Sequence, residues 1–160
     1  MADQATDYLS AVNGVIRICK DAEEGFRGAA SAVNDASLKR LFEEYSSQRA
    51  SFASQLRTVV QESGNEPADP SGIAGTLHHG WIALKGVLTG QSEHQILEET
   101  ERGEDLSVKH YREALSKSLP PQLQSILETQ YQEVKRAHDR IKSLRNQTDR
   151  SSLGNAAGSL

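Results

Sequence analysis

The sequence predicts an all-α protein, an antiparallel bundle of four long helices. Apolar residues recur every three or four positions through four stretches of more than twenty residues each, the spacing of helices that bury one face. The four prolines of the 160-residue chain lie between these stretches or at the start of one, where proline is tolerated. The stretches consist mainly of Leu, Ala, Glu, Lys, Arg and Gln, which are good helix formers.

The first helix is predicted over residues 6–33. Its inward residues are Leu9, Val12, Ile16, Cys19, Phe26, Ala30 and Val33. Asn34 and Asp35 interrupt this pattern. Because aspartate is a favourable N-cap, Asp35 is expected to start the next helix.

The second helix is predicted over residues 37–62. Its inward residues are Leu38, Phe42, Tyr45, Phe52, Leu56 and Val59. Ser63, Gly64 and Asn65 follow, and glycine there is typical of a helix C-terminus. Residues 66–71 contain two prolines and are predicted to form a loop.

A shorter helix is predicted over residues 72–88, inside the connection that follows. Its apolar stripe consists of Leu77, Trp81, Leu84 and Leu88. His78 and His79 are adjacent, and adjacent helical residues diverge by about 100°. We therefore interpret them as a surface pair beside a buried Trp81, not as two ligands of one ion.

The third and fourth long helices are predicted over residues 92–118 and 121–147. The inward residues of the third are Leu97, Val108, Tyr111 and Leu115. Those of the fourth are Leu123, Leu127, Val134, Ile141 and Leu144. Residues 1–149 are thus predicted to form a single helical-bundle domain, and the Ser- and Gly-rich residues 150–160 a disordered tail.

The lengths of the connections predict the topology. Short turns join the first helix to the second and the third to the fourth, so each pair forms an antiparallel hairpin. The connection between the hairpins is long, and its short helix would span roughly 25 Å, most of the bundle. Such a crossover makes the third helix parallel to the second, which is the arrangement of ferritin-like bundles with one crossover.

Composition and charge exclude several classes of function. The formal net charge of −4 argues against a nucleic-acid-binding domain. The sequence has no apolar run of the length that spans a membrane, and its polar, acidic start does not resemble a secretory signal. Cys19 is the single cysteine, so no intrachain disulfide can form, and we predict a buried core residue. These features predict a cytoplasmic protein with no nucleic-acid or membrane partner.

Several polar residues interrupt the apolar faces near the middle of the predicted helices. They are Glu23, Gln48, Arg49, Glu101, Glu104, Gln130, Tyr131 and His138. A bare carboxylate inside a bundle is costly, so each one must be paired with a cation, bound to a metal or protonated. A shift of the predicted helix phase by one position would instead turn these groups toward water.

One interpretation of these residues is a metal site. Glu23, Glu101, Glu104 and His138 would hold iron or manganese, because carboxylates and histidine from facing helices form the metal centres of bundle proteins. Gly103 lies between two of these carboxylates and costs about 1 kcal/mol in a helix. Its presence indicates either a close helix approach or access to such a site.

The other interpretation is a buried polar network. Arg49, with Gln48 beside it, would hold one carboxylate in a bidentate pair, and His138 would hold another. Gln130 and Tyr131 would complete the network from the fourth helix. This interpretation predicts a structural role for the same residues.

Four segments, in the same order, resemble a bacterial family of small four-helix-bundle proteins, the domain of unknown function DUF2383. They are CKDAEEGFR (19–27), LHHGWIALK (77–85), EETERGED (98–105) and VKRAHDR (134–140). The resemblance covers residues 8–146. It implies a ferritin-like fold and a bacterial origin, and it implies no particular activity.

The wider ferritin-like group usually builds a di-iron site from a Glu on each of two helices and a Glu-x-x-His on each of the other two. Glu23 and Glu101 match the single-Glu positions, but the second and fourth helices contain no Glu-x-x-His. The standard di-iron motif is absent, so the resemblance does not imply ferroxidase activity.

We therefore expect a non-enzymatic bundle with an interaction or stress-related role and a buried ion-pair network. The alternative is an iron- or manganese-binding bundle with a non-standard carboxylate and histidine site and redox activity. A homodimer formed through helix packing is the expected assembly. The sequence identifies no other protein partner.

Overall fold

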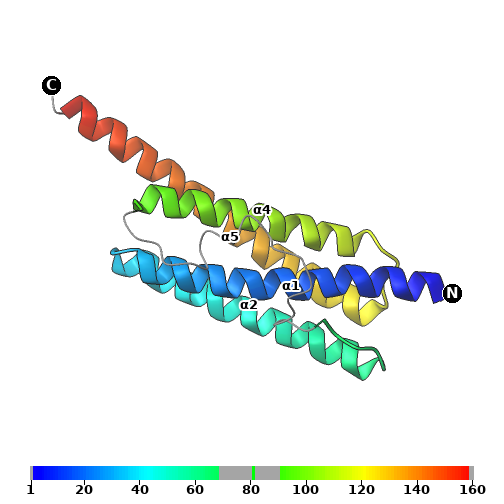
Figure 1. Ribbon diagram of the computed structural model, residues 1–160. Coiled ribbons are helices and arrows are strands. Elements are labelled where there is room, and N and C mark those ends of the chain that lie inside the picture. The colour runs from blue at the N-terminus through cyan, green and yellow to red at the C-terminus, as the bar shows by residue number, and fades with distance from the viewer. Residues whose placement is uncertain (1, 69–80, 82–90, 159–160) are drawn as a thin grey trace.

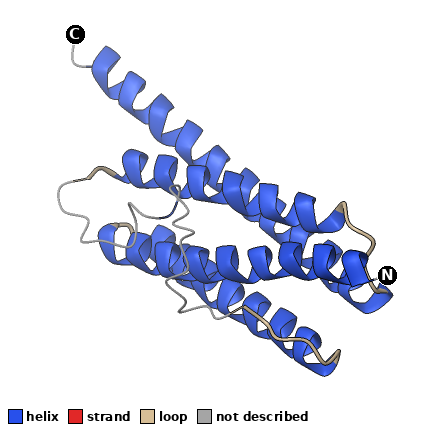
Figure 2. Ribbon diagram, turned by 45° about the vertical axis from the view of Figure 1, so that its right-hand side comes forward, coloured by secondary structure: helices blue, strands red, loops and turns tan. Residues whose placement is uncertain are grey.

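The computed structural model describes residues 2–68, 81 and 91–158, with side chains described over 7–68, 81 and 91–149. Every regular element within these residues is α-helical, as predicted. The four long helices in Figure 1 and Figure 2 are α1 (Ala2–Ala32), α2 (Ala36–Glu62), α4 (Glu93–Leu115) and α5 (Pro121–Gly158).

Local capping interactions explain where the helices begin and end. Asp35 caps α2 as predicted, because its Oδ1 accepts a hydrogen bond of 2.8 Å from the backbone nitrogen of Leu38. Ser92 and Gln95 form a capping box at the start of α4, each side chain bonding the backbone of the other residue. Gly64 has a φ of 83°, the left-handed conformation that glycine adopts readily after a helix.

The helices are arranged with one crossover. α1 packs against both α2 and α4, and α5 packs against α4. Figure 1 shows α2 and α4 running in the same direction, opposite to α1, so the chain crosses the length of the bundle between them. The predicted crossover is confirmed. The short helix predicted over 72–88 lies outside the described residues except for Trp81, which is helical, and His78 and His79 also lie outside them.

Trp81 fills a notch between α1 and α4. Its side chain is fully buried and packs edge-on against Phe26, with ring centroids 4.9 Å apart. A Cβ added at Gly25 on α1 would lie 2.2 Å from Trp81 Cε3, and one added at Gly103 on α4 would lie 2.4 Å from Trp81 Cε2. The two glycines therefore create the space for the indole, and Gly103 marks a close approach to this side chain.

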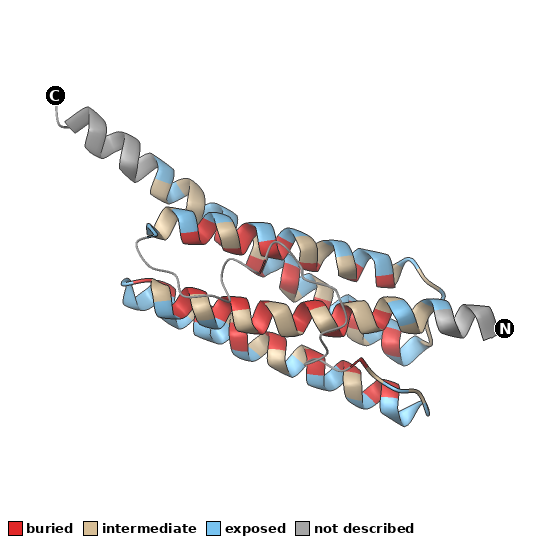
Figure 3. Ribbon diagram, viewed as in Figure 1, coloured by how far each residue is buried: buried red, intermediate tan, exposed pale blue. Residues whose placement is uncertain are grey.

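The core consists of two apolar clusters along the bundle axis, whose buried residues line the inner faces of the helices in Figure 3. Along α2, the residues up to Tyr45 belong to one cluster and those from Phe52 onward belong to the other. Buried Ser46 and Arg49 lie between the two clusters. The middle of the bundle is therefore polar. Among the described helices, none contains the long apolar stretch that crossing a membrane requires.

The C-terminal end of the structure differs from the prediction. α5 continues to Gly158, so residues 150–158 are helical where the sequence predicts a disordered tail. In Figure 1 this end of α5 projects beyond its neighbours. No proline interrupts the segment, and extending a formed helix adds one hydrogen bond per residue without a new nucleation cost.

Candidate functional site

The middle of the bundle is occupied by an ion pair between Arg49 on α2 and Glu104 on α4. Arg49 Nη1 donates to Glu104 Oε1 over 2.5 Å, and Nη2 donates to Oε2 over 2.8 Å. Both side chains are 0% exposed, so the pair joins two diagonal helices inside the core. Such a two-point pair is among the strongest arrangements that arginine forms with a carboxylate.

Neighbouring groups hold the Arg49 guanidinium in place. Its Nε donates to Gln48 Oε1 over 3.3 Å, and its central carbon lies 5.4 Å from the centroid of the Phe26 ring. Burial is the largest single influence and would lower the pKa of Arg49, but the charge of Glu104, its hydrogen bonds and smaller contributions from Cys19 and Tyr111 together raise this pKa. The guanidinium stays charged, and Glu104 supplies the opposite charge that it needs.

A second buried network lies next to this pair. Tyr111 on α4 donates its hydroxyl proton to Gln130 Oε1 on α5 over 2.8 Å, and the Cys19 thiol on α1 lies 3.2 Å from the same hydroxyl. Gln130 Nε2 in turn donates to the Phe52 carbonyl and to Gln55 Oε1, both on α2. This chain of hydrogen bonds connects all four helices. Burial raises the pKa of Cys19 to about 11, so the thiol is protonated at neutral pH and is a poor nucleophile.

Glu23 lies on α1 toward the side facing α2, with its side chain 11% exposed. Its carboxylate accepts hydrogen bonds of 3.0 Å from Lys20 and from Arg27, both on the same helix. Ser46 on α2 donates to the Glu23 backbone carbonyl over 2.8 Å. The charge of Glu23 is thus neutralised by cations of its own helix.

Glu101 on α4 pairs with Arg145 on α5. Its Oε2 lies 2.8 Å from Arg145 Nη1, but the alignment is poor for a hydrogen bond. Among the described residues, neither Glu101 Oε2 nor Arg145 Nε has a hydrogen-bond partner. The pair therefore acts through charge attraction more than through hydrogen bonding.

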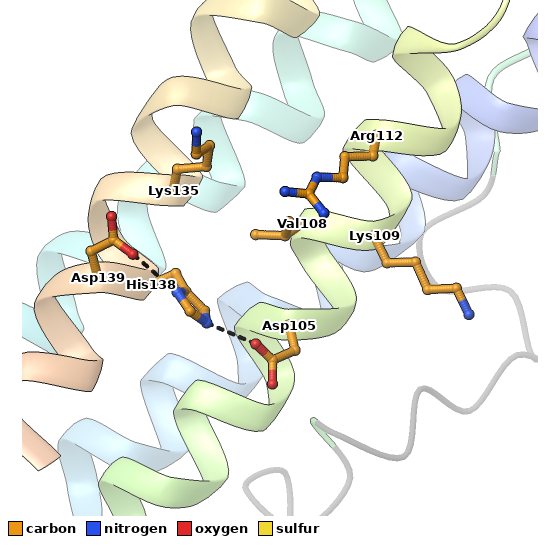
Figure 4. Close-up of a pocket in the computed structure, with 7 residues that line it drawn as sticks. All are labelled: Asp105, Val108, Lys109, Arg112, Lys135, His138 and Asp139. Atoms are coloured by element: carbon orange, nitrogen blue, oxygen red, sulfur yellow. Dashed lines mark hydrogen bonds and ion pairs between the residues drawn. The ribbon is translucent and has the colours of Figure 1, made fainter.

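His138 lies at the outer edge of the α4–α5 interface, shown in Figure 4. Its Nε2 is 2.7 Å from Asp105 Oδ1 on α4, and its Nδ1 is 3.3 Å from Asp139 Oδ1 on its own helix. Burial lowers the pKa of His138, but hydrogen bonds to Asp139 and Asp105 and the nearby Glu101 charge raise it, and the net shift is upward. His138 is a pH-sensitive link between the two helices.

The structure does not gather the four candidate metal ligands into one cluster. Glu104 pairs with Arg49, while Glu23, Glu101 and His138 each have other partners. Over the part of the chain that is described, no three His, Cys, Asp or Glu side chains form a group able to hold a metal ion. The carboxylates that the sequence places in the bundle are instead neutralised by arginine and lysine.

The four residues predicted to form the polar network have different surroundings. Arg49 and Gln130 are buried and belong to the two networks described above. Gln48 and Tyr131 are half-buried. The Tyr131 hydroxyl accepts a hydrogen bond of 2.8 Å from Arg112 Nε on α4, at the surface. The polar centre thus extends from the core to the edge of the α4–α5 interface.

Sequence reasoning missed three residues of these networks. Tyr111 was assigned to the apolar face, and its hydroxyl is the link between Cys19 and Gln130. Asp105 and Arg145 partner the predicted residues His138 and Glu101. Arg145 follows His138 by seven residues and so shares its helix face, a spacing that could have identified it.

The His138 contacts predict a pH-dependent contribution to stability. Because its pKa is higher in the folded chain than the ordinary 6.5, the contribution is fully present below that value and is lost as the pH rises through the folded pKa. Urea unfolding of the wild type and of His138→Gln should therefore differ more at about pH 5.5 than at about pH 8.5. An Asp105→Asn variant should show a smaller pH dependence than the wild type. A His138→Gln effect that is the same at both pH values would contradict this assignment.

Comparisons with known proteins agree with this architecture. The family model described as a domain of unknown function, DUF2383, matches residues 7–117. A solved structure titled as a dodecameric thioferritin, the bacterioferritin-related protein from Bacteroides fragilis, is similar with a TM-score of 0.75 and 14% identity, covering 93% of this chain and 90% of that one. A search of curated proteins gives no match.

A second similar structure contains the fold as one part of a larger protein. It is a two-domain protein from Anabaena variabilis with DJ-1/ThiJ/PfpI-like and ferritin-like domains. Its TM-score is 0.71 at 15% identity, and the match covers 89% of this chain and 40% of that one. At these identities the likeness shows the fold, which is that of a ferritin-like four-helix bundle.

Proposed function

The chain belongs to the DUF2383 family, and from this premise we propose that it is a non-enzymatic bacterial bundle protein with an interaction or stress-related role in the cytoplasm. The observation that carries this proposal is the Arg49–Glu104 pair, fully buried in the middle of the bundle. Arg49 supplies the positive charge that the buried Glu104 carboxylate needs, so no metal ion is required to balance it. The pair supports a role in fixing how the helices pack, because a buried ion pair is satisfied in only one register.

The charge balance of the pair argues against the alternative of an iron or manganese site at Glu104. A metal ion would have to displace the Arg49 guanidinium, since both Glu104 oxygens accept hydrogen bonds from it. The displaced guanidinium would then be a buried charge without a partner, which is strongly unfavourable. Glu23 has two cationic partners of its own and offers no compensation.

Elemental analysis tests this proposal. Untagged protein from cells grown with added iron, manganese and zinc is expected to contain far less than one equivalent of any of them. Arg49→Met serves as the informative variant, because it removes the competing cation and leaves Glu104 free to bind a metal. One equivalent of iron or manganese in the wild type, lost in Glu104→Gln, would overturn the proposal and support the metal-binding alternative.

Assembly belongs to the same proposal. The homodimer expected from helix packing stays a prediction, since the contacts described here lie within one chain. The similar Bacteroides fragilis protein is titled dodecameric, which supports the expectation that a bundle of this fold assembles with copies of itself. Size-exclusion chromatography with light scattering tests the homodimer, and a monomer would contradict it.

A further inference from the structure

An open hollow lies on the outside of the bundle, between α4 and α5. It has a volume of about 430 Å³ and lies away from the buried Arg49–Glu104 pair. The lining residues are Asp105, Val108, Lys109, Arg112, Lys135, His138 and Asp139. Figure 4 shows Val108 between the two helices, with charged side chains on both sides of it.

Two cations line this hollow, Arg112 from α4 and Lys135 from α5. Figure 4 shows the Arg112 guanidinium reaching from α4 toward α5, with Lys135 on the opposite side. Tyr131 positions both: its hydroxyl accepts the Arg112 Nε hydrogen bond of 2.8 Å, and the Lys135 Nζ lies 5.5 Å from its ring centroid. Among the described residues neither cation has a carboxylate partner, and the two terminal nitrogens of Arg112 make no hydrogen bond.

The acidic residues of the hollow are already paired with a histidine. Asp105 and Asp139 both contact the His138 ring, at 2.7 Å and 3.3 Å. When His138 is protonated, its charge offsets part of theirs, and the pKa of His138 is raised by these contacts. The local charge in the half of the hollow near Arg112 and Lys135 is therefore positive, although the formal net charge of the chain is −4.

We propose that this hollow binds a small anion carrying a carboxylate or phosphate group, held between Arg112 and Lys135. The fork of terminal nitrogens on Arg112 matches two oxygens of either group, and Lys135 adds a second charge from the facing helix. Val108 supplies an apolar floor for a short carbon skeleton. Bound there, the anion would connect α4 to α5 at the surface, one layer outside the buried networks.

Nuclear magnetic resonance titration tests the proposal on the whole chain. Inorganic phosphate and succinate are added separately to ¹⁵N-labelled protein at constant pH and ionic strength, with chloride as the control anion. The expected result is a saturable shift of the Val108, Arg112, Lys135 and His138 amide signals. The stronger of the two probes identifies whether phosphate or carboxylate is preferred, and saturation by either supports the site.

Matched variants separate a built site from general surface charge. Arg112→Gln and Lys135→Gln are each expected to weaken binding about tenfold, because each removes one charged contact. Lys142→Gln removes the same charge from an exposed position of α5 that does not line the hollow, so binding should be nearly unchanged. The proposal is overturned if neither probe saturates, if chloride gives the same shifts, or if Lys142→Gln weakens binding as much as the other two.

Discussion

Replacing Glu104 by glutamine is expected to lower the free energy of unfolding by about 3–5 kcal/mol, the usual cost of removing one partner of a buried ion pair. The variant keeps the shape of the side chain and removes its charge. Arg49 would then stay charged in a core where it is 0% exposed, having lost the carboxylate with which it pairs. Urea unfolding followed by circular dichroism measures the change.

A surface pair provides the matched control. Arg102 and Glu99 lie one helical turn apart on α4 at 2.7 Å, with the Arg102 side chain 61% exposed. Glu99→Gln should cost less than about 1 kcal/mol, because water compensates for the lost partner. If Glu104→Gln cost no more than Glu99→Gln, the inner pair would not have the energetic role assigned to it.

Replacing Gly103 by alanine is expected to destabilise the bundle by about 1–3 kcal/mol, as overpacking of a close-packed core does. In an exposed helix the same substitution would stabilise by up to about 1 kcal/mol. The sign reverses here because the new Cβ would lie 2.4 Å from Trp81 Cε2, and the indole is buried against Phe26. Thermal and urea unfolding would both detect the loss.

Removing the indole provides the control for this prediction. In a Trp81→Ala background the notch is empty, so Gly103→Ala should become neutral or stabilising. Gly25→Ala should behave in the same way, since its Cβ would lie 2.2 Å from Trp81 Cε3. A stabilising effect of Gly103→Ala in the wild type would show that Trp81 does not occupy this notch.

The fold could be predicted from the sequence because its signals are local and repeated. The three- and four-residue spacing of apolar residues predicts each helix from neighbouring positions. The Asp35 cap and the glycine at Gly64 predict where α2 begins and ends. The crossover followed from the length of one connection. The end of α5 was mispredicted because a tail rich in small polar residues can extend an existing helix as well as remain disordered.

The candidate site could be predicted only in part, because helix phase identifies an inward residue but not its partner. Arg49 and Glu104 were both placed on inner faces, yet whether a carboxylate meets an arginine or a metal depends on how diagonal helices are rotated and shifted. His138 was predicted to hold a carboxylate, but its partner Asp105 became visible only when α4 and α5 were packed together. The use of Gly25 and Gly103 as two sides of one Trp81 notch likewise required three separate segments to meet.

Arg49 and Glu104 act as one unit in the middle of the bundle, where each buried charge is tolerated only because the other is present. A double-mutant cycle tests it most directly, with Arg49→Met, Glu104→Leu and the combined variant compared by urea unfolding. We predict that each single variant loses about 3–5 kcal/mol, while the double variant stays within about 1 kcal/mol of the wild type or exceeds it, because two apolar side chains can replace a buried pair. A double variant that loses the sum of the two single effects would contradict the claim.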